Sequence, residues 1–401
     1  MNKNNKIQLS SSFLFYTSLF ILFLLPLSLS LSFGGVSANY SFVIFPLIYI
    51  FYKNNIIVPS QNLLLILSLF FLILLISTLY QFDYLKYLDR RILSFTLFIT
   101  IFIFLFININ NEMVRAFKLS IVLISIYFII LNIVQYFNYG GIELKFEAKA
   151  LLGSQRYGFI YLLALWITFF YDPPNKLINL IKKISFILII IGIFLTFSRS
   201  SFVSFLLSFL IFFLYSIQLK QIILKKFYIN IFKVLISFIL IFFVINTYFP
   251  IAIDFYLSRL INFGYSGVLQ NEIILQDPTS SLGFRSFITE KIINFVISNP
   301  FTGSGFLGCW IMFENKVCSA HSQYLDVLFR VGIFGFIIYI YLLLFVLKFL
   351  KNNHRDLFFG FISVLIYGFF HETFKLSHGG FILSFLIGLA FNKKINNKIL
   401  N

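Results

Sequence analysis

The chain has 401 residues, of which 60% are hydrophobic and 11% are charged, and its formal net charge is +17. A mean hydropathy of +0.95 excludes an ordinary soluble globular domain and predicts an all-α polytopic membrane protein. We interpret residues 1–401 as a single integral-membrane domain. Apolar runs of roughly 15 to 22 residues recur along the chain, which suits helices that cross a hydrocarbon core about 30 Å thick.

The apolar runs predict twelve transmembrane helices, each bounded by Lys, Asn, Asp or Pro. Their approximate centres are Leu22, Leu47, Phe71, Ile99, Leu123, Leu163, Ile189, Leu207, Ile239, Tyr339, Leu365 and Leu386. Lys3 and Lys6 precede the first run, Phe13 to Phe33, so a cleaved signal peptide is an alternative for this segment. The run is too long for a signal peptide, and we predict an uncleaved first helix that begins in the cytoplasm.

The distribution of basic residues predicts the orientation. With twelve helices and both termini inside, the cytoplasmic segments hold 18 of the 31 basic residues and three of the 14 acidic residues. The basic residues on this side are Lys3, Lys6, Lys53, Arg115, Lys118, Lys176, Lys182, Lys183, Lys220, Lys225, Lys226, Lys233, Lys348, Lys351, Arg355, Lys393, Lys394 and Lys398. The net charge is then +15 inside and +2 outside, and the positive-inside rule places both termini in the cytoplasm. Because the excess is spread over short loops near the anionic inner leaflet, it indicates membrane lipids as partners and excludes nucleic acid.

Two arginines stand at the outer ends of predicted helices. Arg156, in GSQRYGF, precedes the sixth helix, and Arg199, in TFSRSSF, lies at the tight junction of the seventh and eighth helices. A charge buried in the membrane costs about 2.5 to 3.5 kcal/mol, so an arginine in such a position indicates a function. For Arg199 the alternative is a side chain that extends to the lipid headgroups. For Arg156, a functional role and a non-functional one are equally supported by the sequence.

The longest connection between predicted helices covers residues 250–320 and is expected to be an extracytoplasmic loop. Loops of this length are usually functional. Within it, RSFITEKIINFVISNP (285–300) repeats apolar residues at helical spacing and stops at Asn-Pro, which predicts a short amphipathic helix on the outer surface. Arg285 begins this helix and is a candidate functional residue, with a solvated surface charge as the alternative.

The same loop contains both cysteines, Cys309 and Cys318, nine positions apart. In an oxidising compartment they can form a disulfide, and two unpaired small residues are the alternative. GSGFLG (303–308) lacks the lysine of a phosphate-binding loop and is expected to form a turn. The outer side shows no zinc-ligand spacing and no paired-carboxylate metal motif, so we predict neither a metal nor a cofactor.

A histidine stands at the beginning of the tenth predicted helix, in SAHSQYLDVLFRVGIFGF (319–336). At 100° per residue, Gly332 and Gly335 fall within about 40° of His321. The helix face beneath the imidazole therefore has two positions without a side chain. Such a face admits a close helix or a lipid tail. The alternative is a histidine bonded to backbone at the helix start, with two packing glycines. His371, in HETFKLSHGG, borders the last outer turn and carries a weaker signal.

These segments resemble the O-antigen ligase and polymerase superfamily of bacterial envelope glycan assembly. His-Ser followed by nine residues and GIFG is similar to the family's motif, in which a His and then Asn, Ser or Gln precede a Gly-x-x-Gly by nine residues. LTFSRSSF resembles its Ser-Arg segment after the seventh helix. FRSFITEKIINFVISNPFTGSGF is similar to its loop pattern, an Arg followed by Asn-Pro and a Gly-x-Gly turn. Together the motifs cover about residues 153–335.

The resemblance implies an inverting glycosyl transfer on the outer face of the bacterial inner membrane. The donor would be a polyprenyl-diphosphate-linked glycan, and the acceptor a saccharide or a second lipid-linked glycan. With no metal motif present, we expect Arg199 and Arg285 to stabilise the charge that develops on the diphosphate, because guanidinium groups bind phosphate oxygens bidentately. His321 is the expected general base, since an imidazole titrates near neutral pH, and direct binding of the diphosphate is its alternative role. The residues expected to contribute to substrate binding are Arg156, Ser198, Gly332, Gly335 and His371.

The sequence is also compatible with three functions other than that of a ligase. A polymerase shares the donor chemistry and differs in its acceptor, a second lipid-linked glycan in place of a lipid A core saccharide. A lipid-linked oligosaccharide flippase is the competing class, but transporters commonly show two related halves, and this sequence shows no half-to-half repeat. A purely structural assembly partner is the third alternative.

Overall fold

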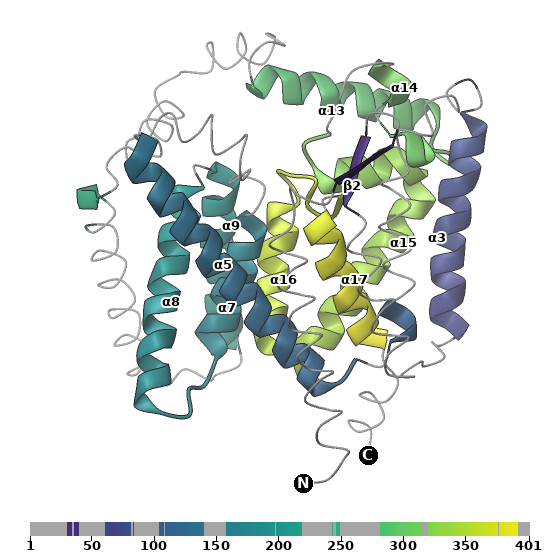
Figure 1. Ribbon diagram of the computed structural model, residues 1–401. Helices are drawn as coiled ribbons and strands as arrows, with labels where there is room; N and C mark the ends of the chain where they lie inside the picture. Colours follow the sequence, from purple (N-terminus) through teal and green to yellow (C-terminus); the bar gives the residue numbers. More distant parts are fainter. Residues whose placement is uncertain are drawn as a thin grey trace. The chain divides into compact units, whose positions relative to one another are not determined.

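The computed structural model describes residues 30–33, 36–39, 61–81, 83, 104–107, 109–139, 158–196, 198–218, 243, 246–248, 281–308, 310–313, 320–375 and 377–391. Its elements are helices apart from one two-stranded hairpin, which agrees with the predicted helical class (Figure 1). The chain divides into two compact units. Unit 1 comprises Met1–Ser120, Leu275–Asn353 and Gly368–Asn401, and unit 2 comprises Ile121–Ile274 and His354–Tyr367. A single integral-membrane domain over the whole chain stays a prediction.

Most of the described elements belong to one unit or the other. The helices of unit 1 are α3 (Gln61–Tyr80), α13 (Ser281–Ser298), α14 (Trp310–Phe313), α15 (Gln323–Asn353) and α17 (Ser377–Phe391), with the 3-10 turns η3 (Gly305–Leu307) and η4 (Thr373–Lys375). The helices of unit 2 are α7 (Gly158–Phe170), α8 (Lys176–Leu195), α9 (Arg199–Gln218) and α16 (Arg355–Tyr367). Helix α5 (Asn111–Tyr139) has residues in both units.

The apolar runs of the sequence become helices wherever the structure describes them. Eight of the twelve predicted centres lie within helices: Phe71, Leu123, Leu163, Ile189, Leu207, Tyr339, Leu365 and Leu386. Outside the described residues lie Leu22, Leu47, Ile99 and Ile239. In the described part of the chain, the helices long and apolar enough to cross a membrane are four: Met113–Val134, Lys176–Leu195, Arg199–Ser216 and Gln323–Asn353. Shorter apolar helices are Leu64–Tyr80, Gly158–Phe170 and Gly379–Phe391. The helical membrane class is thus confirmed, and the number of twelve helices stays a prediction.

The end of the first predicted helix is a strand instead. Ser30–Phe33 (β1) pairs antiparallel with Val36–Asn39 (β2), and Phe33 lies opposite Val36. Polar and apolar residues alternate in SLSF, which suits a strand. The sequence between the strands is Gly34-Gly35, a pair that favours a two-residue hairpin loop. The prediction that the first helix extends to Phe33 is therefore wrong.

Unit 2 is built around α7, which is apolar on all sides and is buried along most of its length. The Trp166 indole N–H donates to Ser363 Oγ of α16 (2.7 Å) and to Ser208 Oγ of α9 (3.3 Å). The rings of Phe209 and Phe359 lie beside it, with centroids 4.7 and 5.2 Å away. Because the indole N–H is buried, it needs these acceptors, and the contacts fix α7 against α9 and α16.

Unit 1 is organised around α15, which packs against α3, α13 and α17. In Figure 1, α13 lies across the end at which α15 begins. Ile288, Ile292 and Val296 follow one another at four-residue spacing, so they share one face of α13. This face is buried against Ala320 and Phe329. A helix is therefore present where the amphipathic helix is predicted, and its apolar face covers the start of α15.

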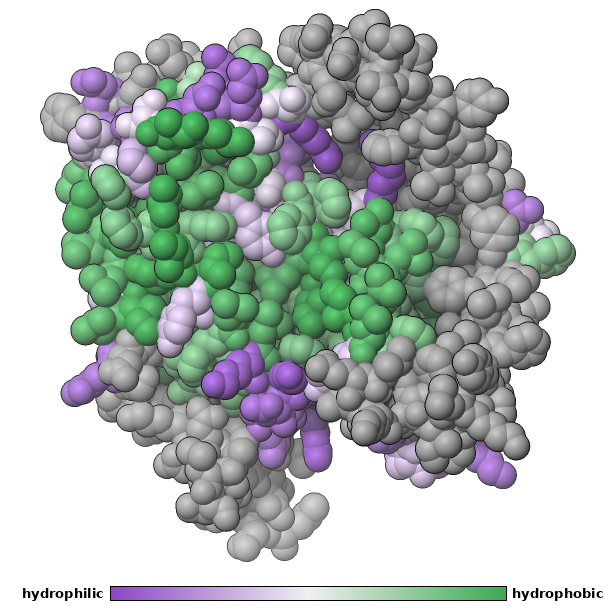
Figure 2. All heavy atoms as spheres, turned by 180° about the vertical axis from the view of Figure 1, so that it is seen from behind, coloured by the Kyte–Doolittle hydropathy of each residue, from purple (hydrophilic) through white to green (hydrophobic). Residues whose placement is uncertain are grey.

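Large apolar side chains are exposed on the described helices. On α15, Phe334, Ile337 and Leu344 are 55%, 58% and 58% exposed, and on α3, Leu65 is 60% exposed. Figure 2 shows hydrophobic side chains over most of the described surface that faces the viewer, with hydrophilic ones above and below them. Such extended apolar surfaces contact lipid in a membrane protein.

Candidate functional site

Helix α13 carries Arg285 on the side that faces α15. Arg285 precedes Ile288 by three residues and Ile292 by seven, so the three side chains lie on one side of the helix. Ile288 and Ile292 are fully buried in the cluster that contains Ala320. Arg285 itself is half-buried. The packing of α13 thus brings the guanidinium group towards the segment that precedes α15.

His321 lies two residues before α15 and not within it. Its φ is 52°, and among the described residues it is the only non-glycine residue with positive φ. A helix requires φ near −60°, so α15 begins at Gln323. The prediction that His321 continues the helical face of Gly332 and Gly335 is therefore wrong, because the left-handed residue turns the chain before the first helical turn.

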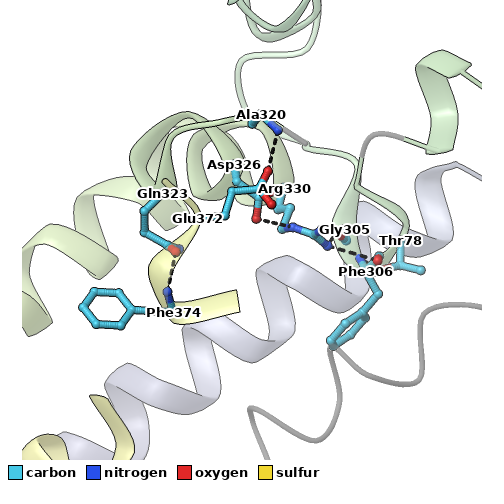
Figure 3. A network of polar contacts seen from close by, with 9 residues as sticks. All are labelled: Thr78, Gly305, Phe306, Ala320, Gln323, Asp326, Arg330, Glu372 and Phe374. Carbon is cyan, nitrogen blue, oxygen red and sulfur yellow. Dashed lines mark hydrogen bonds and ion pairs between the residues drawn. The ribbon is translucent and has the colours of Figure 1, made fainter. Parts of the chain in front are cut away.

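The loop at residues 368–374, between α16 and α17, holds the backbone on both sides of His321. Before it, the Ala320 N–H donates to the carboxylate of Glu372 (Figure 3). After it, the Gln323 N–H donates to Gly368 O (2.8 Å). Two backbone groups that flank the left-handed residue are thus tied to the same loop.

Side chains add two contacts to the same junction. Gln323 Oε1 accepts a hydrogen bond from the Phe374 N–H (2.8 Å), which is also drawn in Figure 3. The rings of Tyr324 and Phe369 lie 4.4 Å apart, centroid to centroid. We call this set of contacts between residues 320–324 and the 368–374 loop the loop clamp.

His371 belongs to this loop and lies within electrostatic reach of Arg285 and His321. Burial, followed by the nearby charges of Arg285 and His321, lowers the pKa of His371 from 6.5 to about 4. The imidazole is therefore neutral at pH 7 and can donate one hydrogen bond and accept another. We call Arg285, His321 and His371, which come from three separate segments of unit 1, the Arg–His cluster.

A second polar network fixes the glycine-rich turn, GSGFLG, beside α15. Arg330 Nε donates to Asp326 Oδ2 (2.8 Å), one helical turn earlier. Its Nη1 donates to the carbonyl oxygens of Gly305 (3.2 Å) and Phe306 (3.0 Å), as Figure 3 shows. Thr78 Oγ1 of α3 accepts from the Phe306 N–H (2.9 Å). Because Arg330 and Asp326 are both buried, these bonds offset part of their desolvation and hold the turn to α15 and α3.

The two glycines of the predicted motif pack against protein. Gly332 has φ of 64° and interrupts α15, and a Cβ atom there would lie 2.8 Å from Pro300 O. The Ile333 N–H donates to the same Pro300 oxygen (2.9 Å), so the turn after α13 satisfies the backbone at the interruption. Gly335 approaches α3, where a Cβ atom would lie 3.4 Å from Ile73 Cγ2. A role of either glycine in binding substrate stays a prediction.

Two other predicted site residues belong to unit 2. Arg199 is the first residue of α9 and is exposed. Ser198 is buried and caps this helix, since its Oγ accepts from the Ser201 N–H (3.4 Å) and shares a hydrogen bond with Ser200 Oγ (2.6 Å). The pairing of Arg199 with Arg285 therefore stays a prediction. Outside the described residues lie Arg156, Cys309 and Cys318.

The sequence interpretation missed Glu372 and Gln323, which hold the segment around His321. Glu372 directly follows His371 and is the last acidic residue of the chain. An isolated acidic residue in a predicted outer turn is a signal that could have identified it. Gln323 offers no such signal, because its partners lie in a loop that is distant in the sequence.

The Arg–His cluster combines a fixed positive charge with two imidazoles. A guanidinium group binds anionic oxygens, and an imidazole can accept or donate a proton near neutral pH. Within the described residues, no group of three or more His, Cys, Asp and Glu side chains could hold a metal ion. The cluster thus contains one group that can bind an anion and others that can exchange a proton.

Long apolar helices with exposed apolar faces, and a polar cluster where α15 begins, define a helical membrane protein with a polar site. Residues 184–340 match the family model described as O-antigen ligase. This match supports a place for the chain in the O-antigen ligase and polymerase superfamily, a group of glycosyltransferase-like membrane proteins of the bacterial envelope. The matched region contains Arg199, Arg285 and His321, and it ends before His371. Among curated proteins, no sequence matches the chain.

Proposed function

We propose that the protein transfers a glycan from a polyprenyl-diphosphate-linked donor to an acceptor hydroxyl on the outer face of the inner membrane, in the manner of an O-antigen ligase. The observation that carries the proposal is the Arg–His cluster, in which Arg285 and His321 both lie within electrostatic reach of His371, while α13 packs against Ala320, the residue before His321. The match of residues 184–340 to the O-antigen ligase family model supports the same class of reaction. The chemistry of each side chain then assigns it a step.

The leaving group of the donor is a diphosphate, whose negative charge increases as the glycosidic bond breaks. Arg285 supplies a guanidinium group that can bind two of its oxygens at once. Arg199 supplies the second guanidinium in this scheme. It is exposed at the start of a 20-residue helix, where the helix dipole also favours an anion. Arg156 and Ser198 are proposed to contribute to donor binding.

The acceptor hydroxyl must lose its proton as it attacks the sugar. His321 is the proposed general base, because it is half-buried and belongs to the same cluster as the arginine that would bind the leaving group. His371 stays neutral at pH 7 and is suited to a hydrogen bond with the diphosphate or the acceptor. Attack from the face opposite the diphosphate inverts the configuration of the sugar, and the scheme uses no metal. Direct binding of diphosphate by His321 is the alternative role.

The location of the site follows from the charge distribution. In the proposed topology, twelve helices cross the bacterial inner membrane and both termini are cytoplasmic. Residues 250–320 and the 368–374 loop then lie outside, which places the Arg–His cluster on the extracytoplasmic side. A donor anchored by its polyprenyl chain presents its diphosphate at this level of the membrane.

A flippase would use similar donor contacts, and the interruption of α15 at Gly332 is a feature that transporters share. In transporters, however, the backbone at such an interruption binds the substrate. Here the Ile333 N–H is already bonded to Pro300 O, so the interruption serves packing. This contact favours transfer over transport.

The deciding experiment uses purified protein in sealed proteoliposomes, a defined lipid-linked oligosaccharide, and either a lipid A core saccharide or a second lipid-linked oligosaccharide as acceptor. A ligase extends the first acceptor and a polymerase the second, and product sizing distinguishes them. No product with either acceptor, together with movement of the donor across the bilayer, would replace the proposal by a flippase.

Substitutions in the cluster test the assigned roles in the same assay. His321→Ala should lower kcat by about 10² to 10⁴ while the donor still binds, because it removes the base. Arg285→Lys keeps the charge but loses the planar fork, so it should also impair turnover. Lys291→Arg, an exposed position on the same helix, is the matched control and should be unchanged. Near-full transfer by folded His321→Ala would show that another group is the base.

A further inference from the structure

The loop clamp holds His321 in a conformation that the residue would not adopt by itself. A φ of 52° is unfavourable for a side chain with a Cβ atom, and it persists only where the surroundings determine it. The two backbone N–H groups nearest to His321 in the clamp are those of Ala320 and Gln323, and both donate to the 368–374 loop. The loop therefore determines the direction in which the imidazole leaves the backbone.

Within the clamp, Glu372 makes the contact that involves a formal charge. A carboxylate that accepts from a backbone N–H forms a stronger hydrogen bond than a neutral acceptor does. The contact joins Ala320, the residue directly before His321, to Glu372, the residue directly after His371. This hydrogen bond thus links the residue before one imidazole of the Arg–His cluster to the residue after the other.

Burial around this contact limits the alternatives open to the chain. Ala320 is 3% exposed and belongs to the apolar cluster that also packs α13. On the loop side, a Cβ atom at Gly379 of α17 would lie 2.8 Å from the carbonyl carbon of Thr373, so the loop is held closely against the next helix. Both sides of the Ala320 to Glu372 contact are therefore anchored, and the contact can transmit a fixed geometry.

We propose that Glu372 is a positioning residue for His321 in the transfer reaction, and that the 368–374 loop is part of the active site. This inference rests on the proposed function, in which His321 is the general base. Glu372 acts through the backbone: it holds Ala320, and so keeps the His321 imidazole within reach of His371. General base catalysis depends on such placement, because a small displacement of the base lowers the rate without abolishing binding.

Transfer by the full chain in nanodiscs tests the role with three variants of Glu372. Glu372→Gln keeps an oxygen that can accept from the Ala320 N–H and should retain most of the wild-type kcat. Glu372→Ala removes the acceptor and Glu372→Asp withdraws it by one methylene, so both should lower kcat by roughly 10-fold to 100-fold with a smaller change in KM for the donor. Glu290→Ala, an exposed glutamate on α13, is the matched control and should be unchanged. Equal decreases in kcat for Glu372→Gln and Glu372→Ala would overturn the proposal. A change in KM for the donor with no change in kcat would also overturn it.

Thermal unfolding tests the clamp without any substrate. His321→Gly relieves the left-handed backbone and should raise the unfolding midpoint of the wild type. In the Glu372→Ala background, His321→Gly should raise the unfolding midpoint by less, because the backbone at residue 321 is no longer held in the left-handed conformation. Equal gains in both backgrounds would overturn the proposal. The stability experiment and the transfer assay can also give different answers. If the gain shrinks as expected but the wild type transfers no glycan, the clamp is supported and the proposed function is contradicted.

Discussion

At the scale of single residues, the Arg–His cluster carries less positive charge than its three basic side chains could, because His371 is neutral at pH 7. Arg285 is a permanent cation, whereas His371 is neutral at pH 7, because burial and the neighbouring charges lower its pKa to about 4. A neutral imidazole within reach of the guanidinium avoids part of the repulsion that two cations would create. The same imidazole can still donate a hydrogen bond to an anion that Arg285 attracts.

The lowered pKa of His371 predicts a pH dependence of stability. Between about pH 6.5 and pH 4, the unfolded chain binds a proton at this position that the folded chain does not bind, so the free energy of unfolding falls as the pH falls through this range. His371→Gln removes the titrating group. The unfolding midpoint of the wild type should therefore drop more steeply between pH 7 and pH 5 than that of the variant, as measured by thermal unfolding in detergent.

The comparison contains its own control at pH 7.5, where both states of the wild type carry a neutral imidazole. There the difference between wild type and variant reflects packing alone. Parallel pH profiles from pH 7.5 to pH 4.5 would contradict the lowered pKa.

At the scale of elements, Gly332 links the course of α15 to the turn that follows α13. Its φ of 64° directs the chain so that the Ile333 N–H reaches Pro300 O (2.9 Å). Beyond the interruption, the ring of Phe301 stacks on that of Phe334, with centroids 5.2 Å apart. The motif Gly-x-x-Gly thus combines a conformational requirement at its first position with close packing at its second.

Gly332→Ala should destabilise the fold. A left-handed conformation costs a non-glycine residue about 1 to 3 kcal/mol, and the new Cβ atom would lie 2.8 Å from Pro300 O. We expect a lower thermal unfolding midpoint and a lower yield of monodisperse protein. Ile337→Ala, on the 58% exposed face of the same helix, should leave the midpoint nearly unchanged in detergent. A variant at Gly332 as stable as this control would refute the conformational requirement.

At the scale of the whole molecule, the amino-acid sequence predicts where helices lie better than how they end. Long apolar runs identify α8, α9 and α15 because a membrane helix needs little beyond length and hydropathy. Arg285 and His321 could be found from motif spacing. The left-handed His321, the interruption at Gly332 and the contact of Ala320 with Glu372 could not, because each depends on groups far apart in the chain, 52 positions in the last case.

The charge distribution predicts the topology of the whole chain. Reporter fusions at Lys53, Lys183 and Lys226 should all report a cytoplasmic location, because these residues contribute to the basic excess of the inner side. A fusion after Glu314 should report the opposite side. An outside signal at Lys183 or Lys226 would reverse the topology and place the Arg–His cluster on the wrong face for a lipid-linked donor.

The interruption of α15 also bears on how the protein matches the thickness of the bilayer. A continuous helix of 31 residues would be about 46 Å long, well beyond a hydrocarbon core of about 30 Å. The part that follows Gly332, from Ile333 to Asn353, is about 31 Å long and fits that core without tilting. If that part spans the core, Asp326 and Arg330 are expected at the depth of the lipid headgroups, where a charged pair is far less costly than among acyl chains. One glycine thereby divides α15 into a part that matches the thickness of the hydrocarbon core and a part that supports the proposed active site.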